Sequence, residues 1–165
     1  MLSFKTHGVQ FNARAAALII DDGYLLLHRA VGDDFWVLPG GRIEPNESAA
    51  QATCRELLEE TGQAIECEGL AFCVENFFEW QGQLAHELGF YFHASLSSSS
   101  PLANKHHAHS AVEGTQQLEY RWFKLTALGG LAVHPEFLRT AKLEKGSPVQ
   151  HVVQGTPGQR GVSDA

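Results

Sequence analysis

The first third of the chain alternates short apolar runs with turn signals, a pattern that predicts β-strands. Residues 15–20 form a continuous apolar run that ends at Asp-Asp-Gly in positions 21–23, a sequence typical of a tight turn. Residues 24–29 then predict the second strand of a hairpin, and residues 36–38 predict a further short strand. This part of the chain is therefore expected to supply strands.

Residues 47–61 carry the signals of one amphipathic helix. Asn46 is expected to cap its N-terminus, Glu47 places a negative charge in the first turn, and Gly62 suits the left-handed position after the last turn. The side chains expected to face the core are apolar, namely Ala50, Cys54, Leu57 and, at the margin, Leu58.

The second half of the chain returns to strand patterns. Residues 69–79 and 84–96 predict two long strands joined by a turn at Gln-Gly in positions 81–82. Residues 118–124 predict another strand, and residues 150–153 predict an edge strand. Together with the hairpin, these strands predict one substantial sheet.

Three segments have a different character. Residues 97–117 lack apolar periodicity, which predicts a mobile surface loop, and their histidine tract at 106–109 is interpreted as part of that loop. Residues 134–143 predict a second helix. Residues 154–165 are expected to form a disordered tail, so residues 1–153 are interpreted as one domain.

Charge and composition limit the classes of function. The chain has 165 residues, 44% of them hydrophobic, and a formal net charge of −7. No basic cluster accompanies that negative charge, so a nucleic-acid partner is not expected. The composition fits one small enzyme domain with a full core, and leaves a homodimer open.

Cysteine use and hydropathy suggest a reducing compartment. Cys54, Cys67 and Cys73 form no C-x-x-C pair and are expected to be buried free thiols. The first residues lack the apolar region of a signal peptide, and no stretch approaches 18 apolar residues. We therefore expect a cytoplasmic protein without a membrane span.

Three carboxylates at the end of the predicted helix are the strongest chemical signal. Glu56, Glu59 and Glu60 stand at i, i+3 and i+4, which places them on one helical face. Like charges at this spacing repel, and a bound hard cation such as Mg²⁺ removes the repulsion because it prefers carboxylate oxygens. By spacing alone, a solvated acidic face is the alternative.

The surrounding residues resemble the Nudix box, whose pattern is G-x5-E-x7-R-E-U-x-E-E-x-G-U with U apolar. The matching positions are Gly41, Glu47, Arg55, Glu56, Leu57, Glu59, Glu60 and Gly62. Gln63 departs from the apolar consensus at the last position, which concerns packing rather than chemistry. The resemblance implies a Nudix-type α/β/α sandwich with a mixed sheet.

The resemblance also implies a metal centre with Mg²⁺ or Mn²⁺. The expected ligands are Glu56, Glu59, Glu60 and the backbone carbonyl of Gly41. A bound divalent ion clamps phosphate oxygens and lowers the pKa of a coordinated water. The expected reaction is therefore hydrolysis of a phosphoanhydride bond.

Further residues are expected to support the reaction. Arg55, four residues before Glu59, is expected to orient the carboxylates together with Glu47. Arg42 is a candidate for contact with the substrate. Phe77 is a candidate to stack on a nucleobase, although packing in the core is the better interpretation for Phe77 or Phe78.

The identity of the general base is left open. Glu56 is the default, but Nudix enzymes also recruit a glutamate from beyond the box. Glu119, three residues before Trp122, and Glu87, beside His86, are the two candidates here.

The predicted function is metal-dependent hydrolysis of a nucleoside diphosphate linked to another moiety, with a nucleoside triphosphate or a related small nucleotide as the plain choice. The proline, tyrosine and S-Q-P-W-P-F-P-x-S signatures of three Nudix subfamilies are absent. The alternatives are a non-catalytic sensor of nucleotide metabolites and an RNA 5′-pyrophosphohydrolase, which the charge of −7 disfavours. The isopentenyl diphosphate isomerase branch would need an upstream cysteine that is not present.

Overall fold

The computed structural model describes residues 1–158. In chain order, its strands are β1 Ser3–Thr6, β2 Val9–Asp21, β3 Tyr24–Ala30, β4 Trp36–Val37, β5 Gly40–Arg42, β6 Ile65–Trp80, β7 Gln83–Leu96, β8 His109–Glu113, β9 Gln116–Lys124, β10 Val133–His134 and β11 Gln150–Gln154. The helix α1 covers Ala49–Thr61. Three short 3₁₀ segments are η1 Pro101–Ala103, η2 Leu125–Gly130 and η3 Glu136–Arg139.

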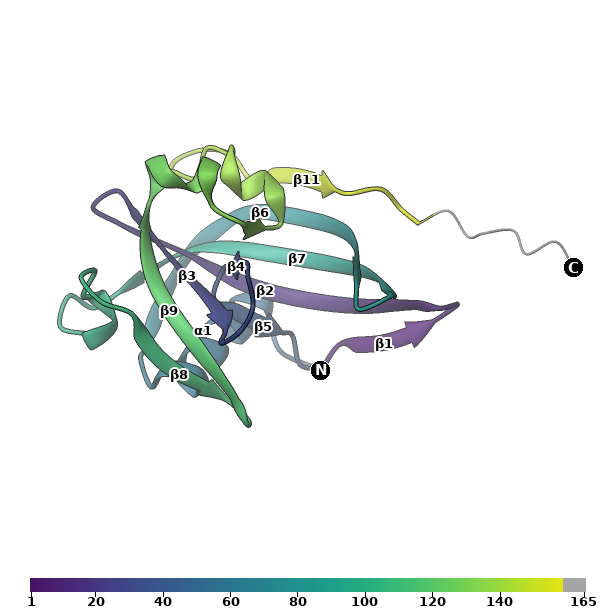
Figure 1. Ribbon diagram of the computed structural model, residues 1–165, viewed down its shortest axis with the longest axis horizontal. Helices are drawn as coiled ribbons and strands as arrows, with labels where there is room; N and C mark the ends of the chain where they lie inside the picture. The colour runs from purple at the N-terminus through teal and green to yellow at the C-terminus, as the bar shows by residue number, and fades with distance from the viewer. Residues whose placement is uncertain (159–165) are drawn as a thin grey trace, which may run out of the picture.

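The strands form one mixed sheet, as the sequence predicts (Figure 1). Its main path runs β10-β4-β3-β2-β7-β6-β11, with β1 and β5 beside β2, and β9 and β8 beside β3. The pairs β2–β7, β6–β11 and β4–β10 are parallel, and the others are antiparallel. β2 pairs with β3 only at Ile20 and Asp21, next to the turn. Along the rest of its length β2 runs beside β7, and it thereby joins the two halves of the sheet.

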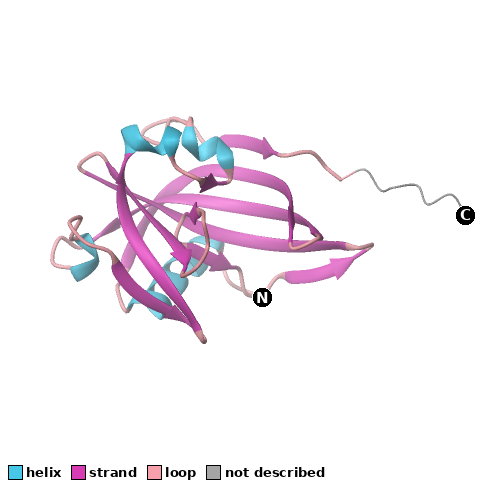
Figure 2. Ribbon diagram, viewed as in Figure 1, coloured by secondary structure: helices cyan, strands magenta, loops and turns pink. Residues whose placement is uncertain are grey.

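The sheet is covered by helical segments on both of its faces (Figure 2). On one face, Leu57 of α1 packs with Ile19 of β2, so the helix covers this side of the sheet. On the other face, Leu128 of η2 and Leu138 of η3 pack against Phe72 of β6. The predicted α/β layering is confirmed. The second covering layer is made of 3₁₀ turns instead of an α-helix.

The helix α1 begins later than predicted. Ser48 is its N-cap, because the Ser48 side chain accepts a hydrogen bond from the Gln51 amide while the Gln51 side chain accepts one from the Ser48 amide. The prediction of Asn46 as the cap is wrong, since Asn46 lies two residues earlier with φ of +65°. Gly62 ends the helix in the left-handed conformation, as predicted.

The buried face of α1 also differs from the prediction. The fully buried side chains are Ala52, Thr53, Leu57 and Glu60. Leu58 is 52% exposed, and Ala50 and Cys54 are half-buried. The reason is that the inward stripe continues through Glu60, so a carboxylate takes the place of an apolar residue in the last turn.

The prediction of a structureless loop over residues 97–117 is wrong for two parts of that range. Leu102 of η1 is buried, and β8 pairs antiparallel with β9 through Ala111 and Leu118. His109, the last histidine of the tract, is the first residue of β8. The sequence pattern did not predict β8, because Ala111 is its one buried side chain and a single apolar position gives no alternation.

The predicted helix at residues 134–143 is also wrong. His134 belongs to β10 and pairs with Val37, and only Glu136–Arg139 forms a single 3₁₀ segment. Pro135 has no backbone N–H to donate, so the chain stays extended before it. Phe137 and Leu138, which suggested a helical face, instead pack under the sheet.

Several other predictions are confirmed. The hairpin turns at Asp22 and Gly23, and the long β6–β7 pair turns at Gln81 and Gly82, all four residues having positive φ. The edge strand β11 forms beside β6 and includes Gln154, which the prediction had assigned to the tail. Residues 159–165 of the predicted tail lie outside the described residues.

The tryptophans and cysteines largely follow expectation. Trp36 and Trp122 are buried in the core. Cys54, Cys67 and Cys73 are free thiols, but each is half-buried rather than buried. Within residues 1–158, no helix combines the length and apolar character that a bilayer crossing requires.

Candidate functional site

Three carboxylates meet where α1 approaches the hairpin of β8 and β9. Glu56 and Glu60 of α1 and Glu113 of β8 each offer an oxygen atom, and these atoms lie within 4.8 Å of one another. Glu113 did not appear among the sequence candidates because its strand was predicted to be a loop. We call these three residues the acidic cluster.

Glu59, in contrast, lies outside the acidic cluster. Its side chain is 61% exposed, and its carboxylate accepts a hydrogen bond from Arg55 Nη1 at 3.1 Å. The i, i+4 pair Glu56 and Glu60 therefore faces inward, while the i+3 residue stands at the margin of the same face. The position of Glu59 favours Glu56, Glu60 and Glu113 over it as metal ligands.

Arg55 connects the start of the helix to the acidic cluster. Its guanidinium group donates to Glu47 at 2.7 and 3.1 Å, to Glu56 Oε1 at 2.9 Å and to the Arg42 carbonyl at 3.1 Å. The hydrogen bond from Arg55 is the main reason that the pKa of Glu47 is lowered. These contacts match the predicted orienting role, because they fix the Glu56 carboxylate against the backbone that precedes the helix.

Gly41 provides the space that Glu56 occupies. A Cβ atom at Gly41 would lie 2.2 Å from Cδ of Glu56, so no larger residue fits without displacing that carboxylate. Gly41 itself pairs with Ala15 of β2, which anchors it to the sheet. Gly41 thus lies directly against Glu56, and metal ligation by the Gly41 carbonyl stays a prediction.

Glu60 lies in a buried pocket of aromatic side chains that the sequence did not reveal. The Tyr120 hydroxyl donates a hydrogen bond to Glu60 Oε2, and His28 Nδ1 stands 3.9 Å from the same atom. Burial raises the pKa of Glu60 to about 7 and lowers that of His28 to about 3. His28 of β3 and Tyr120 of β9 are register partners. The signal that could have placed them side by side is therefore the pairing of these two strands.

The stability of the metal-free protein should fall as pH rises through about 7. The pKa of Glu60 is higher in the folded chain than its ordinary value of 4.5, so its contribution to stability is fully present below pH 4.5 and is lost as the pH passes about 7. In a chelating buffer, we expect Glu60→Gln to melt several degrees above the wild type at pH 8 and close to it at pH 5. A melting-temperature difference that does not change with pH would contradict this assignment.

The acidic cluster fits a divalent cation. It offers only carboxylate oxygens, which Mg²⁺ and Mn²⁺ prefer. Burial raises the pKa of both Glu56 and Glu60, and the hydrogen bonds from Arg55 and Tyr120 compensate their ionised forms only in part. A bound cation would supply the remaining compensation.

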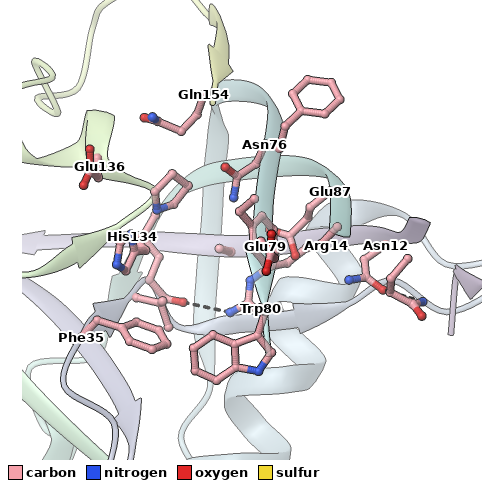
Figure 3. Close-up of a pocket in the computed structure, with 18 of the residues that line it drawn as sticks. Asn12, Arg14, Phe35, Asn76, Glu79, Trp80, Glu87, His134, Glu136 and Gln154 are labelled. Atoms are coloured by element: carbon pink, nitrogen blue, oxygen red, sulfur yellow. Dashed lines mark hydrogen bonds between the residues drawn. The ribbon is translucent and has the colours of Figure 1, made fainter. Parts of the chain in front are cut away.

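A cleft of about 730 Å³ lies on the face of the sheet that carries Asn12, Arg14 and Ala16 of β2 (Figure 3). Arg42, which follows Gly41, also lines the cleft. Phe35 forms one wall and makes edge contacts with Trp80 and His134, at 5.5 and 5.1 Å between ring centroids. The volume and the aromatic lining are typical of a small-molecule site.

Arg14 separates the cleft from the acidic cluster. Its Nη2 donates to the carbonyls of Leu38 and Gly40 at 3.2 and 3.0 Å, which holds the guanidinium group against the turn before α1. Its positive charge opposes the effect of burial on the pKa of both Glu60 and Glu87. Arg14 is thus a cation that both parts of the site share.

The remaining sequence candidates have separate positions. Glu119 is held by Arg29 at 2.9 Å and by Arg121 at 2.5 Å, and it does not join the acidic cluster. Glu87 lies on the floor of the cleft. The expectation that Phe77 or Phe78 packs in the core is wrong, because both line the cleft and Phe78 is 38% exposed.

Comparison with known sequences gives one family and several relatives. A family model described as a NUDIX domain matches residues 10–142. The chain is 33% identical over 112 residues to the CTP pyrophosphohydrolase of Escherichia coli K12, and this match covers 64% of this chain and 78% of that protein. It is 53% identical over 38 residues to a putative 8-oxo-dGTP diphosphatase of Bacillus subtilis, where the match covers 23% of this chain and 26% of the relative. The match thus spans about a quarter of that relative.

Solved structures resemble the whole fold. The MutT NUDIX hydrolase of Burkholderia pseudomallei aligns with a TM-score of 0.56 at 28% identity, over 71% of this chain and 85% of that one. A MutT protein of Bacillus halodurans aligns with a TM-score of 0.59 at 20% identity, over 85% and 89% of the two chains, and shows the fold alone.

Proposed function

The chain belongs to the NUDIX family, and from this premise we propose that it is a divalent-metal-dependent pyrophosphohydrolase of small nucleotides. The observation that carries the proposal is the acidic cluster, in which Glu56, Glu60 and Glu113 converge, in a chain that also has a cleft of nucleotide size. Mg²⁺ or Mn²⁺ is the proposed cation, because all three groups are hard oxygen donors.

Each part of the site has a distinct task in this proposal. The acidic cluster holds the cation, which neutralises phosphate charge when bound. Arg55 orients Glu56 through their 2.9 Å contact, and we assign to Glu56 the acceptance of a proton from the attacking water. Glu119 is a poor candidate for this step, because two arginines already occupy its carboxylate.

The cleft supports a small nucleotide as the substrate. Its aromatic wall of Phe35 and Trp80 offers rings on which a base can stack, and Arg42 stands where the phosphates would enter. A long RNA chain has less support, because Asp34, Glu79 and Glu136 also line the cleft and the chain carries a net charge of −7.

A non-catalytic sensor is the rival class, and the site argues against it. A sensor needs the cleft but has no use for the contacts that hold Glu56 beside Gly41 and Arg55. These contacts fix the Glu56 carboxylate in one position, as a catalytic group requires.

A panel of nucleoside triphosphates and nucleoside diphosphate derivatives, assayed with Mg²⁺ or Mn²⁺, tests the proposed function. We expect release of a nucleoside monophosphate from at least one substrate, and no release after chelation of the metal. Product analysis in ¹⁸O-labelled water identifies the phosphorus that is attacked. Tight binding of a nucleotide without any hydrolysis would favour the sensor instead.

A further inference from the structure

A row of polar side chains crosses the floor of the cleft on three neighbouring strands. Glu87 of β7 is the register partner of Asn12 of β2 on one side and of Asn76 of β6 on the other. All three residues line the cleft, and Figure 3 shows Asn76 and Asn12 on either side of Glu87. We call these residues the polar row.

The Glu87 carboxylate has no partner within residues 1–158, where it forms neither an ion pair nor a hydrogen bond. Burial raises its pKa, and the nearby charges of Arg14 and Arg42 oppose that effect only in part. Asn12 Oδ1 accepts a hydrogen bond from Ser3 Oγ at 2.7 Å, which leaves the Asn12 amide N–H groups available. Glu87 is half-buried, and a partly desolvated carboxylate without donors is unfavourable, so the polar row is suited to a ligand that brings hydroxyl or amino groups.

Tyr91 packs beside the polar row on the same face of β7. Tyr91, two positions beyond Gly89, is 2% exposed and lines the cleft. A Cβ atom at Gly89 would lie 2.8 Å from Cε1 of Tyr91, so the ring fills the space beside Gly89. The negative charge of Glu87 is close enough to contribute to the raised pKa of Tyr91. The Tyr91 ring therefore adjoins the polar row inside the cleft.

The position of the polar row along the cleft indicates which part of a nucleotide it would meet. Asn12 lies two residues from Arg14 on the same strand, a separation of about 7 Å. Arg14 lies close enough to Glu60 of the acidic cluster to oppose the rise in its pKa, and Phe78 of β6 lies two residues beyond Asn76 in the opposite direction along the sheet. The order along the cleft is thus cation and phosphates, then the polar row, then aromatic rings. A nucleotide has the matching order of phosphates, sugar and base.

We propose that Glu87 accepts hydrogen bonds from the 2′- and 3′-hydroxyl groups of the substrate's ribose, with Asn12 and Asn76 beside it, so that the enzyme prefers ribonucleotides to 2′-deoxyribonucleotides. A carboxylate that accepts from ribose hydroxyls is a recurring mode of nucleotide recognition. A deoxyribose leaves this half-buried acceptor without one of its donors, which disfavours the 2′-deoxyribonucleotide. The inference rests on the proposed function, because it takes the acidic cluster as the phosphate end.

The test compares matched nucleotide pairs. The kcat/KM values for CTP and dCTP, and for GTP and dGTP, are measured for the wild type, Glu87→Ala and Glu75→Ala. We expect the wild type to favour the ribonucleotide by about tenfold or more, and Glu87→Ala to bring the ratio near one by lowering the ribonucleotide value. Glu75 is the matched control, because it lies on β6 next to Asn76 but pairs with His151 outside the cleft. Its substitution should leave the ratio unchanged.

A second measurement separates this inference from the proposed function. Calorimetric binding of CMP and dCMP, and of GMP and dGMP, requires no hydrolysis. We expect tighter binding of the ribose form to the wild type and equal binding of the two forms to Glu87→Ala, which removes both acceptor oxygens. Hydrolysis of ribose and deoxyribose forms at equal rates, or an equal loss of both in Glu87→Ala, would overturn ribose recognition while the proposed function stands. Absence of hydrolysis with every substrate would overturn the proposed function. In that case, the binding of the monophosphates alone would test ribose recognition by Glu87.

Discussion

Replacing Glu56 by glutamine should lower kcat by roughly 10³-fold without unfolding the protein. The substitution keeps the side-chain volume and an oxygen that can accept from Arg55, which donates to Glu56 Oε1 at 2.9 Å. It removes the negative charge from the acidic cluster and the proposed proton acceptor together. Steady-state hydrolysis of the best substrate of the panel measures the effect, and a thermal melt confirms that the fold is retained.

Glu59→Gln is the matched control for this prediction. Glu59 stands on the same helix three residues later, but its side chain is exposed and lies outside the acidic cluster. We expect Glu59→Gln to retain activity within about threefold, since an exposed ion pair contributes little. If both variants lost activity equally, the distinction between the two carboxylates would be wrong.

Gly41→Ala should lower kcat by about 100-fold while leaving stability nearly unchanged. The added Cβ would lie 2.2 Å from Cδ of Glu56, and the end of that flexible side chain can move aside. The fold therefore tolerates the change, whereas the carboxylate leaves its position by an ångström or more, a shift that can reduce a rate by this factor. Activity measured beside a thermal melt separates the two effects.

Gly40→Ala provides the contrast to that variant. A Cβ at Gly40 would lie 2.1 Å from the carbonyl oxygen of Ala15, a backbone atom that cannot move aside, and φ at Gly40 is +152°. We expect this variant to lose stability rather than activity alone. Equal melting temperatures for the two alanine variants would contradict this interpretation of the glycine pair.

The sequence was most informative where chemistry fixes the spacing of residues. Gly41, Glu47, Arg55 and Glu56 were all predicted to cooperate, and their contacts in the structure join them into one network. Local rules also located the hairpin turn at Gly23 and the end of the helix at Gly62, because positive φ favours glycine at both places.

The parts that sequence analysis missed depend on contacts between distant segments. Glu113 joins the acidic cluster only because β8 pairs with β9, and one buried side chain, Ala111, gave that strand too weak a pattern to detect. The buried partners of Glu60 are Tyr120 and His28, which come together through strand pairing. Periodicity along the chain contains no information on such register.

The predicted helix at residues 134–143 failed for a related reason. In the structure, Glu136–Arg139 forms only a short 3₁₀ segment, and its Phe137 and Leu138 pack against the sheet. Val37, which pairs with His134, lies about a hundred residues earlier in the sequence, so the local pattern could not reveal the strand.

Binding of Mn²⁺, followed by electron paramagnetic resonance, tests the central claim most directly. It reports occupancy of the acidic cluster without requiring the right substrate. The account predicts that the wild-type protein binds Mn²⁺, that Glu56→Gln weakens binding by about tenfold or more, and that Glu59→Gln binds nearly as the wild type does. Equal Mn²⁺ affinity in the wild type and in Glu56→Gln would contradict the claim that Glu56, Glu60 and Glu113 form the metal site.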